Sequence, residues 1–240
     1  AMATFFTESR VIASHHFTCP VPGPQSVDVT YKPITFLRDP VDRALSTYFY
    51  QKRQVEKGID KKFTELPFEE YFERVRQKGY SDSEGKWSYL CNMQAYIMDR
   101  DYDMNRAKER MAEEFFFAGV SERFDECLLI LKKKFGTEGI NFKINYFEKN
   151  KGQKLDAERY LPGQIYKKTL ELNQMDRELH AFANQLLDEK IREYGVSFYT
   201  DLENFHKQQK RWRLVAGFAE LFGKAIRYQD RLLMKLWDKI

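Results

Sequence analysis

The most constraining stretch of this sequence is ITFLRDPVDRALSTYFY, residues 34–50. Residues 34–37 are apolar and partly β-branched, which predicts a short buried strand. Asp39 is suited to cap a helix, and Pro40 is suited to the first helical position because proline lacks an amide hydrogen that would go unused there. Apolar residues then recur at the spacing of one helix face. The stretch therefore predicts a strand, a sharp turn and a helix over 40–57.

The rest of the chain alternates between apolar runs and helical patterns. EFFFAGV, residues 114–120, predicts a second buried strand, and residues from 141 onward show strand-like alternation before a basic loop. Helices are predicted over 67–78, 87–98, 103–114, 162–194 and 207–238, and from about Ser121 through Leu131. Strands separated by helices favour an α/β fold with three layers, in which a mostly parallel sheet is flanked by helices. Helices predominate by residue number, so the fold is helix-rich.

Arg38 stands where the predicted strand gives way to the predicted helix. Ligands of open parallel sheets bind beyond the carboxyl ends of the strands, and a guanidinium group suits phosphate in charge and shape. At about 100° per residue, Ser46 falls opposite the apolar face of the helix, so its hydroxyl could meet a polar ligand. Arg38 and Ser46 could therefore bind one phosphate from two sides. These residues alone leave a structural alternative open, in which Arg38 pairs with Asp42 and Ser46 is an ordinary surface residue.

The motif RDPVDRALSTYF, beginning at Arg38, resembles the 3′-phosphate-binding motif RDPxxRxxSxY of a known family. These are the carbohydrate sulfotransferases that use 3′-phosphoadenosine-5′-phosphosulfate (PAPS), and the resemblance is strongest to the heparan-sulfate 2-O and 6-O sulfotransferase group and its bacterial relatives. It implies that Arg38 and Ser46 hold the 3′-phosphate of the cofactor. It also implies the P-loop-NTPase-like sulfotransferase fold.

Other segments resemble the same family. SHHF, residues 14–17, resembles the segment that carries the family's catalytic base, which implies His16, or else His15, as the base. Histidine suits this role because it exchanges a proton near neutral pH. INYFEKNKGQK resembles the loop that covers the cofactor, which implies that Lys151 and Lys154 lie near the nucleotide.

Two further segments match at the level of pattern. WSYLCNMQAYIM, residues 87–98, resembles the family's NxQ segment, with Asn92 and Gln94 in register. FFFAGVSERFDECLLIL resembles a strand–helix unit of the family, in which we interpret Glu122 as part of the helix start. His180 is interpreted as a packed or surface residue of a helix.

One element of the family has no counterpart in this sequence. Family members begin with a strand and a loop, a lysine followed by small residues, that cradles the 5′-phosphosulfate, and nothing in residues 1–15 matches it. We expect either that the printed sequence starts downstream of this loop or that the protein has lost it. Residues 1–206 are accordingly interpreted as a sulfotransferase-like α/β domain without its phosphate-loop portion, and residues 207–240 as a basic amphipathic helical extension.

The charge distribution sets this extension apart. Residues 207–240 hold nine basic and three acidic side chains, a net charge of +6, so the whole-chain charge of +4 leaves −2 for residues 1–206. The main body is therefore not expected to bind nucleic acid. The apolar spacing of the extension suits docking on its own domain, homo-oligomer formation or peripheral contact with an anionic membrane.

With three cysteines and four histidines spread along the chain, no metal site is expected.

Two classes of function are compatible with these features. The first is a sulfotransferase that moves a sulfuryl group from PAPS to the hydroxyl of an acceptor, expected to be a glycan. The second is a non-catalytic sulfotransferase-like domain that acts in binding or assembly. The sequence shows no signal peptide and no membrane-spanning run, which predicts a cytoplasmic protein, or a Golgi-lumenal one if the chain belongs to a longer eukaryotic protein.

Overall fold

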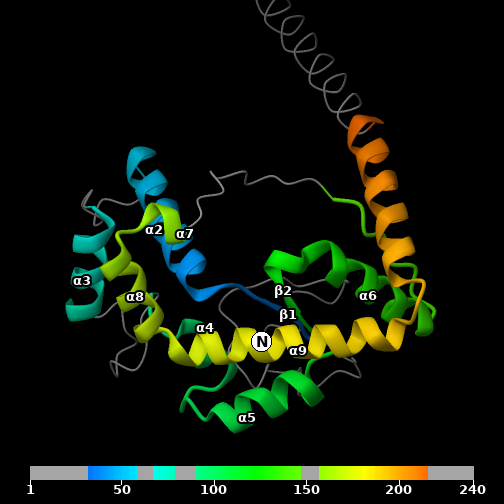
Figure 1. Cartoon of the computed structure of the whole chain (residues 1–240), viewed down its shortest axis with the longest axis horizontal. Helices are drawn as coiled ribbons and strands as arrows, with labels where there is room; N and C mark the ends of the chain where they lie inside the picture. Colours follow the sequence, from blue (N-terminus) through cyan, green and yellow to red (C-terminus); the bar gives the residue numbers. More distant parts are fainter. Residues whose placement is uncertain (1–31, 59–66, 79–89, 147–156, 216–240) are drawn as a thin grey trace, which may run out of the picture. The chain divides into compact units, whose positions relative to one another are not determined.

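The computed structural model describes residues 32–58, 67–78, 90–146 and 157–215 (Figure 1). These residues belong to two compact units. The first unit lies within residues 1–124 and 153–190, and the second lies within residues 125–152 and 191–240. The first unit contains the strands and the stretch that begins at Ile34.

The two predicted strands form a parallel pair. β1 (Ile34–Leu37) lies beside β2 (Phe117–Val120), with Ile34 opposite Phe117 and Leu37 opposite Val120. All four residues of β2 are buried, as expected for a short apolar run in a parallel sheet. A small parallel sheet within a helix-rich chain is thus confirmed, and this pair is the whole sheet within the described residues.

The helices occupy most of the remaining described residues. They are α2 (Pro40–Glu56), α3 (Phe68–Lys78), α4 (Met93–Met98), α5 (Met104–Glu109) with the π-helical turn Arg110–Glu114, the 3₁₀ turn Ser121–Arg123, α6 (Phe124–Thr137), α7 (Ala157–Tyr160), α8 (Gly163–Leu172), α9 (Gln174–Tyr194) and a helix over 198–215. The helices predicted from Pro40, from 67 and from 103 are confirmed. The helical stretch predicted over 162–194 is two helices, which meet at the buried residue Asn173.

One predicted strand is wrong. Residues 141–146, where the sequence alternates like a strand, have no regular secondary structure. The side chain of Gln209 forms hydrogen bonds to this stretch in place of a neighbouring strand. Its Nε2 donates to the Tyr146 carbonyl oxygen (2.6 Å), and its Oε1 accepts from Asn145 Nδ2 (3.1 Å). Residues 10–17 (RVIASHHF), whose pattern also predicts a strand that runs into a loop, lie outside the described residues.

Two apolar clusters form a core among the described residues of the first unit. α2, α3, α7 and α8 gather around one cluster (Figure 1). Its buried members are Val41, Ala44, Leu45, Tyr48, Phe68, Tyr71, Phe72, Leu90, Ala157 and Leu161. Four of these residues lie on α2 at the predicted spacing, so the expected core face of this helix is confirmed.

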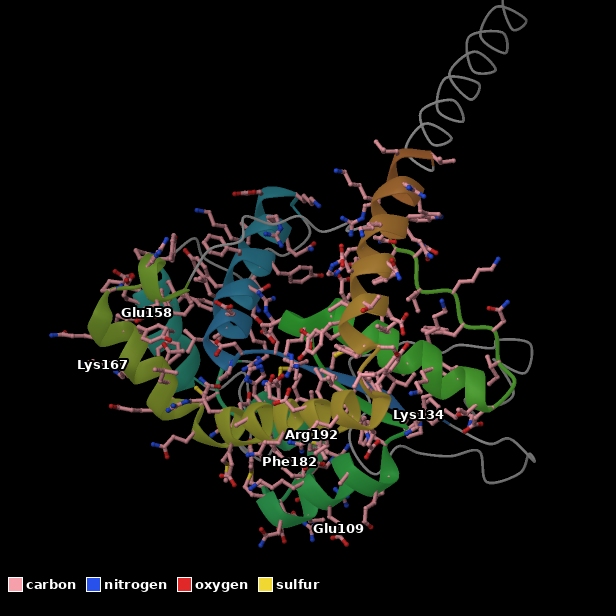
Figure 2. The ribbon with its side chains drawn as sticks, turned by 45° about the vertical axis from the view of Figure 1, so that its right-hand side comes forward. Glu109, Lys134, Glu158, Lys167, Phe182 and Arg192 are labelled. Carbon is pink, nitrogen blue, oxygen red and sulfur yellow. The ribbon has the colours of Figure 1, made fainter. Side chains whose placement is uncertain are left out.

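The second cluster of the first unit joins the sheet to α9. α9 runs alongside the strands and α5, and Leu179 and Ala183 of α9 are fully buried there (Figure 1). Figure 2 shows Phe182 on the part of α9 that lies over α5, and the Lys108 ammonium group lies 5.8 Å from the centre of its ring. This packing fixes α9 against the sheet, close to the carboxyl ends of both strands.

A buried carboxylate, Asp99, ties together the turn that follows α4. Asp99 is 1% exposed, accepts the amide of Asp101 (2.9 Å), and is paired with the guanidinium groups of Arg106 and Arg110. The pKa of Asp99 is lowered to about 2, chiefly because Arg106 hydrogen-bonds to the carboxylate. Backbone amides of the turn, including that of Asp103, act in the same direction.

This depressed pKa predicts a pH dependence of stability. A carboxyl group with a lowered folded-state pKa stabilises the protein above its ordinary pKa, and the contribution is lost as the pH falls from about 4 through 2. Because the Arg106 side chain is 41% exposed, solvent screens this pair, and we expect its contribution to stability to be small. Urea unfolding of wild type and Asp99→Asn is measured at about pH 6, above this window, and at about pH 2.5, within it. The difference in the free energy of unfolding between the two proteins should be smaller at the lower pH. Asp101→Asn, at a 74% exposed side chain, is the matched control, and equal differences at both pH values would contradict the role of Asp99.

Candidate functional site

The candidate site lies where the parallel strands end and α2 begins. Since β1 and β2 run parallel, the residues that follow Leu37 and Val120 emerge at the same edge of the sheet. Arg38 follows β1 directly, and the 3₁₀ turn that begins at Ser121 follows β2. This is the position at which open parallel sheets bind their ligands.

Asp39 caps α2 as predicted. Its Oδ1 accepts the amides of Val41 (2.9 Å) and Asp42 (3.0 Å), while Pro40 has no amide hydrogen to satisfy. The backbone N–H of Asp39 donates to Glu122 Oε1 (2.8 Å). The Asp39 carboxylate thus already uses two of the first amides of α2, so an anion at this corner would have to be held largely by side chains.

The side-chain amide of Gln94 holds the peptide of Arg38 from both sides. Gln94 Oε1 accepts the Arg38 N–H (2.8 Å), and Gln94 Nε2 donates to the Arg38 carbonyl oxygen (2.9 Å). Gln94 is buried, and it satisfies backbone groups that lie one residue beyond the paired part of β1. Its effect is to fix the backbone from which the Arg38 side chain extends.

A buried ion pair lies behind this clamp. Arg43 Nη2 lies 3.5 Å from Asp176 Oδ2, and the Asp176 side chain is fully buried. Asp176 also accepts the amides of Gln94 (3.2 Å) and Ala95 (2.7 Å), at the first turn of α4. Burial raises the pKa of Asp176, and the charge of Arg43 together with these amides opposes that rise. Burial likewise lowers the pKa of Arg43, against the opposing charge of Asp176.

Two asparagines hold α4 against α9 next to this pair. Asn92 adopts a left-handed backbone conformation with φ of 47°, which asparagine tolerates better than most residues. Its N–H donates to Asn173 Oδ1 (2.9 Å), and its own Oδ1 accepts the Met175 amide (3.1 Å). The NxQ segment therefore serves here to connect the end of β1, α4 and α9.

The guanidinium of Arg38 and the hydroxyl of Ser46 have no hydrogen-bond or ion-pair partner among the described residues. Both residues are partly exposed. The alternative in which Arg38 forms an ion pair with Asp42 is therefore not seen in this part of the chain. Burial raises the pKa of Asp42, and the nearby charge of Arg38 and the Ala157 amide act against that rise. Arg38 thus lies near the start of α2, and its side-chain donors have no hydrogen-bond partner within the part of the chain that the structure describes.

His180 and Glu122 form a second pair at this edge, and it was not predicted from the sequence. His180 Nε2 lies 3.2 Å from Glu122 Oε2, and Glu122 Oε1 accepts the Asp39 amide. Burial acts to raise the pKa of Glu122, but the hydrogen bonds from His180 and Asp39 lower it below its ordinary value. The prediction that Glu122 is a structural residue of the helix start agrees with these contacts, which join the turn after β2 to the cap of α2.

The remaining predicted site residues lie outside the described residues. These are His15 and His16, proposed as the base, and Lys151 and Lys154, proposed near the nucleotide. The structure therefore bears on Arg38 and Ser46 alone among the predicted site residues. Sequence reasoning missed the roles of Asp176 and Asn173, and it interpreted His180 as a packed or surface helix residue without predicting its pairing with Glu122. The matched Asn92–Gln94 segment was one signal that pointed to their region.

Comparisons with known proteins leave the family open. No family model matches the chain, and no curated protein and no solved structure matches it. In the described part of the chain, no helix combines the length and apolar character needed to cross a membrane. The same residues contain no cluster of three or more histidine, cysteine or acidic side chains placed to hold a metal ion.

Proposed function

We propose that this chain binds a 3′-phosphoadenosine nucleotide at Arg38 and Ser46 and acts as a PAPS-dependent sulfotransferase. The observation that carries the proposal is a partly exposed arginine whose guanidinium forms no ion pair with the described residues, at the carboxyl end of a parallel strand. The clamp from Gln94 holds the backbone of this arginine before any ligand arrives. Such preorganisation lowers the entropic cost of binding a phosphate.

The geometry of α2 suits a phosphate held from two sides. Ser46 lies seven residues beyond the cap residue Asp39, which places it about 10 Å along the helix axis. Arg38 has a long side chain that extends from the cap end, so a phosphate could lie between its guanidinium and the Ser46 hydroxyl. The RDPxxRxxSxY pattern supports the same two residues as ligands of the 3′-phosphate, and Lys151 and Lys154 are proposed to lie near the nucleotide.

The proposed reaction is the transfer of a sulfuryl group to a hydroxyl. The acceptor oxygen forms a bond to sulfur while the bond between sulfur and the 5′-phosphate oxygen breaks, which releases 3′-phosphoadenosine-5′-phosphate. The proton of the acceptor hydroxyl passes to a base, for which we propose His16, with His15 as the alternative. The acceptor is proposed to be a carbohydrate, within a three-layer sulfotransferase-like domain over residues 1–206 and a basic extension over 207–240.

Binding selectivity for the 3′-phosphate tests the proposal. Titration calorimetry should show 3′-phosphoadenosine-5′-phosphate binding at least about a hundredfold more tightly than adenosine 5′-phosphate, because only the former offers a group for Arg38. The first nucleotide should also raise the melting temperature further at equal concentration. Transfer of labelled sulfuryl from PAPS to a carbohydrate panel then tests the reaction itself. Equal affinity for both nucleotides would refute the assignment of Arg38, and selective binding without transfer would favour the non-catalytic alternative.

A further inference from the structure

The second unit contains a surface pocket that the proposed function does not use. The pocket has a volume of about 470 Å³ and is lined by Asp125, His206, Gln209, Lys210, Arg213 and Leu214. This volume falls within the range of small-molecule sites, about 300–1,000 Å³. Five of the six lining residues lie on the helix over 198–215, and Asp125 lies in the first turn of α6.

A hydrogen-bonded network fixes the walls of this pocket. Asp125 Oδ1 accepts from the Tyr146 hydroxyl (2.7 Å), and Asp125 Oδ2 lies 3.0 Å from His206 Nε2. Gln209 is only 4% exposed and is bonded to both Asn145 and the Tyr146 carbonyl oxygen. Three segments distant in sequence are thus tied together around the pocket, so its shape exists without a ligand.

The charges on these walls favour an anion. Asp125, the one acidic lining residue, already accepts the Tyr146 hydroxyl at Oδ1, and its Oδ2 lies next to His206 Nε2. Lys210 is exposed and has no ion-pair partner among the described residues, and the Arg213 guanidinium is positioned 5.1 Å from the centre of the Tyr146 ring. His206 Nε2 lies 3.0 Å from Asp125 Oδ2, and its Nδ1 has no partner in the same described part of the chain.

We propose that this pocket binds the phosphate or sulfate ester group of a small anionic ligand. Lys210 and Arg213 supply the positive charge, and His206, held by Asp125, supplies a directed ring nitrogen next to them. Charge-assisted hydrogen bonds from such groups are roughly twice as strong as neutral ones. The inference does not depend on the proposed function, because Arg38 and Ser46 belong to the other unit.

The ring signal of His206 offers a local measurement of binding. The nuclear magnetic resonance spectrum of the full chain with labelled histidine should contain four histidine signals, one for each histidine. The signal that disappears in the His206→Asn variant is that of His206. The probes are glucose 6-phosphate, glucose 6-sulfate, inorganic phosphate and inorganic sulfate at constant ionic strength. We expect the His206 signal to shift and saturate with an ester of either kind. The ester should bind more tightly than its inorganic ion, because the pocket has room for more than the ion alone.

Matched lysine variants separate the pocket from general electrostatic attraction. Lys210→Ala should weaken the binding of the esters about tenfold. Lys207→Ala, at a 63% exposed side chain paired with Glu203 at 2.7 Å, should leave it within about twofold. Arg38→Ala should leave the His206 response unchanged, which distinguishes this site from the proposed nucleotide site. A His206 signal that does not saturate, that responds to the inorganic ions but not to the esters, or that responds equally in Lys210→Ala and Lys207→Ala would overturn the proposal.

Discussion

Replacing Asp176 with alanine is expected to lower the free energy of unfolding by about 3–5 kcal/mol, the usual cost of leaving one partner of a buried ion pair without the other. The Asp176 side chain is fully buried, and its partner Arg43 is 13% exposed, so solvent cannot readily replace the lost carboxylate. The substitution also removes the acceptor for the Ala95 amide (2.7 Å). Urea unfolding followed by circular dichroism measures the change.

A double-mutant cycle with Arg43→Met identifies the cause. If most of the cost comes from a stranded guanidinium, adding Arg43→Met to Asp176→Ala should cost less than Arg43→Met alone, by about 1 kcal/mol or more. Glu178→Ala is the matched control, since Glu178 lies on the same helix, is 52% exposed and pairs with Lys108 at the surface. It should change stability by less than about 1 kcal/mol. Additive effects of the two core substitutions would show that the pair is not energetically coupled, and Asp176→Asn provides a milder variant for the same cycle.

The parts of the fold that the sequence predicted are those governed by local chemistry. β1 and the start of α2 are encoded within a few neighbouring residues, because an apolar run, a capping aspartate and a first-turn proline each act on adjacent backbone. The parallel pairing of β1 with β2 also followed from a pattern, since both runs are apolar and separated by helices. Local propensity and tertiary packing agree at these positions.

The parts that sequence reasoning missed depend on partners distant in the chain. Gln94 contacts Arg38 across 56 positions and Asp176 across 82, and no periodicity of the sequence reports such pairs. The alternation near Tyr146 misled for the same reason. The backbone carbonyl of Tyr146 accepts a hydrogen bond from Gln209, 63 positions away, and not from a neighbouring strand. A single sequence contains the residue types of a polar network but not the assignment of donors to acceptors.

Replacing Arg38 with alanine is expected to weaken the binding of 3′-phosphoadenosine-5′-phosphate about a hundredfold, or about 3 kcal/mol, the scale of a lost charge-assisted interaction with phosphate. The affinity for adenosine 5′-phosphate should stay nearly unchanged, because that nucleotide lacks the group that Arg38 is proposed to hold. Ser46→Ala should cost less, about tenfold, since a neutral hydroxyl contributes one hydrogen bond. Titration calorimetry with both nucleotides measures these differences.

Stability and position provide the controls for this prediction. The Arg38 guanidinium has no ion-pair partner among the described residues, so Arg38→Ala should leave the urea unfolding midpoint close to that of wild type. Arg53→Ala removes the same charge from an exposed position in the last turn of α2 and should leave both nucleotide affinities unchanged. Because the two variants alter net charge equally, a difference between them reflects the position of Arg38 and not the net charge of the protein. If Arg38→Ala and Arg53→Ala weaken binding to the same extent, Arg38 attracts nucleotides through charge alone and does not recognise the 3′-phosphate.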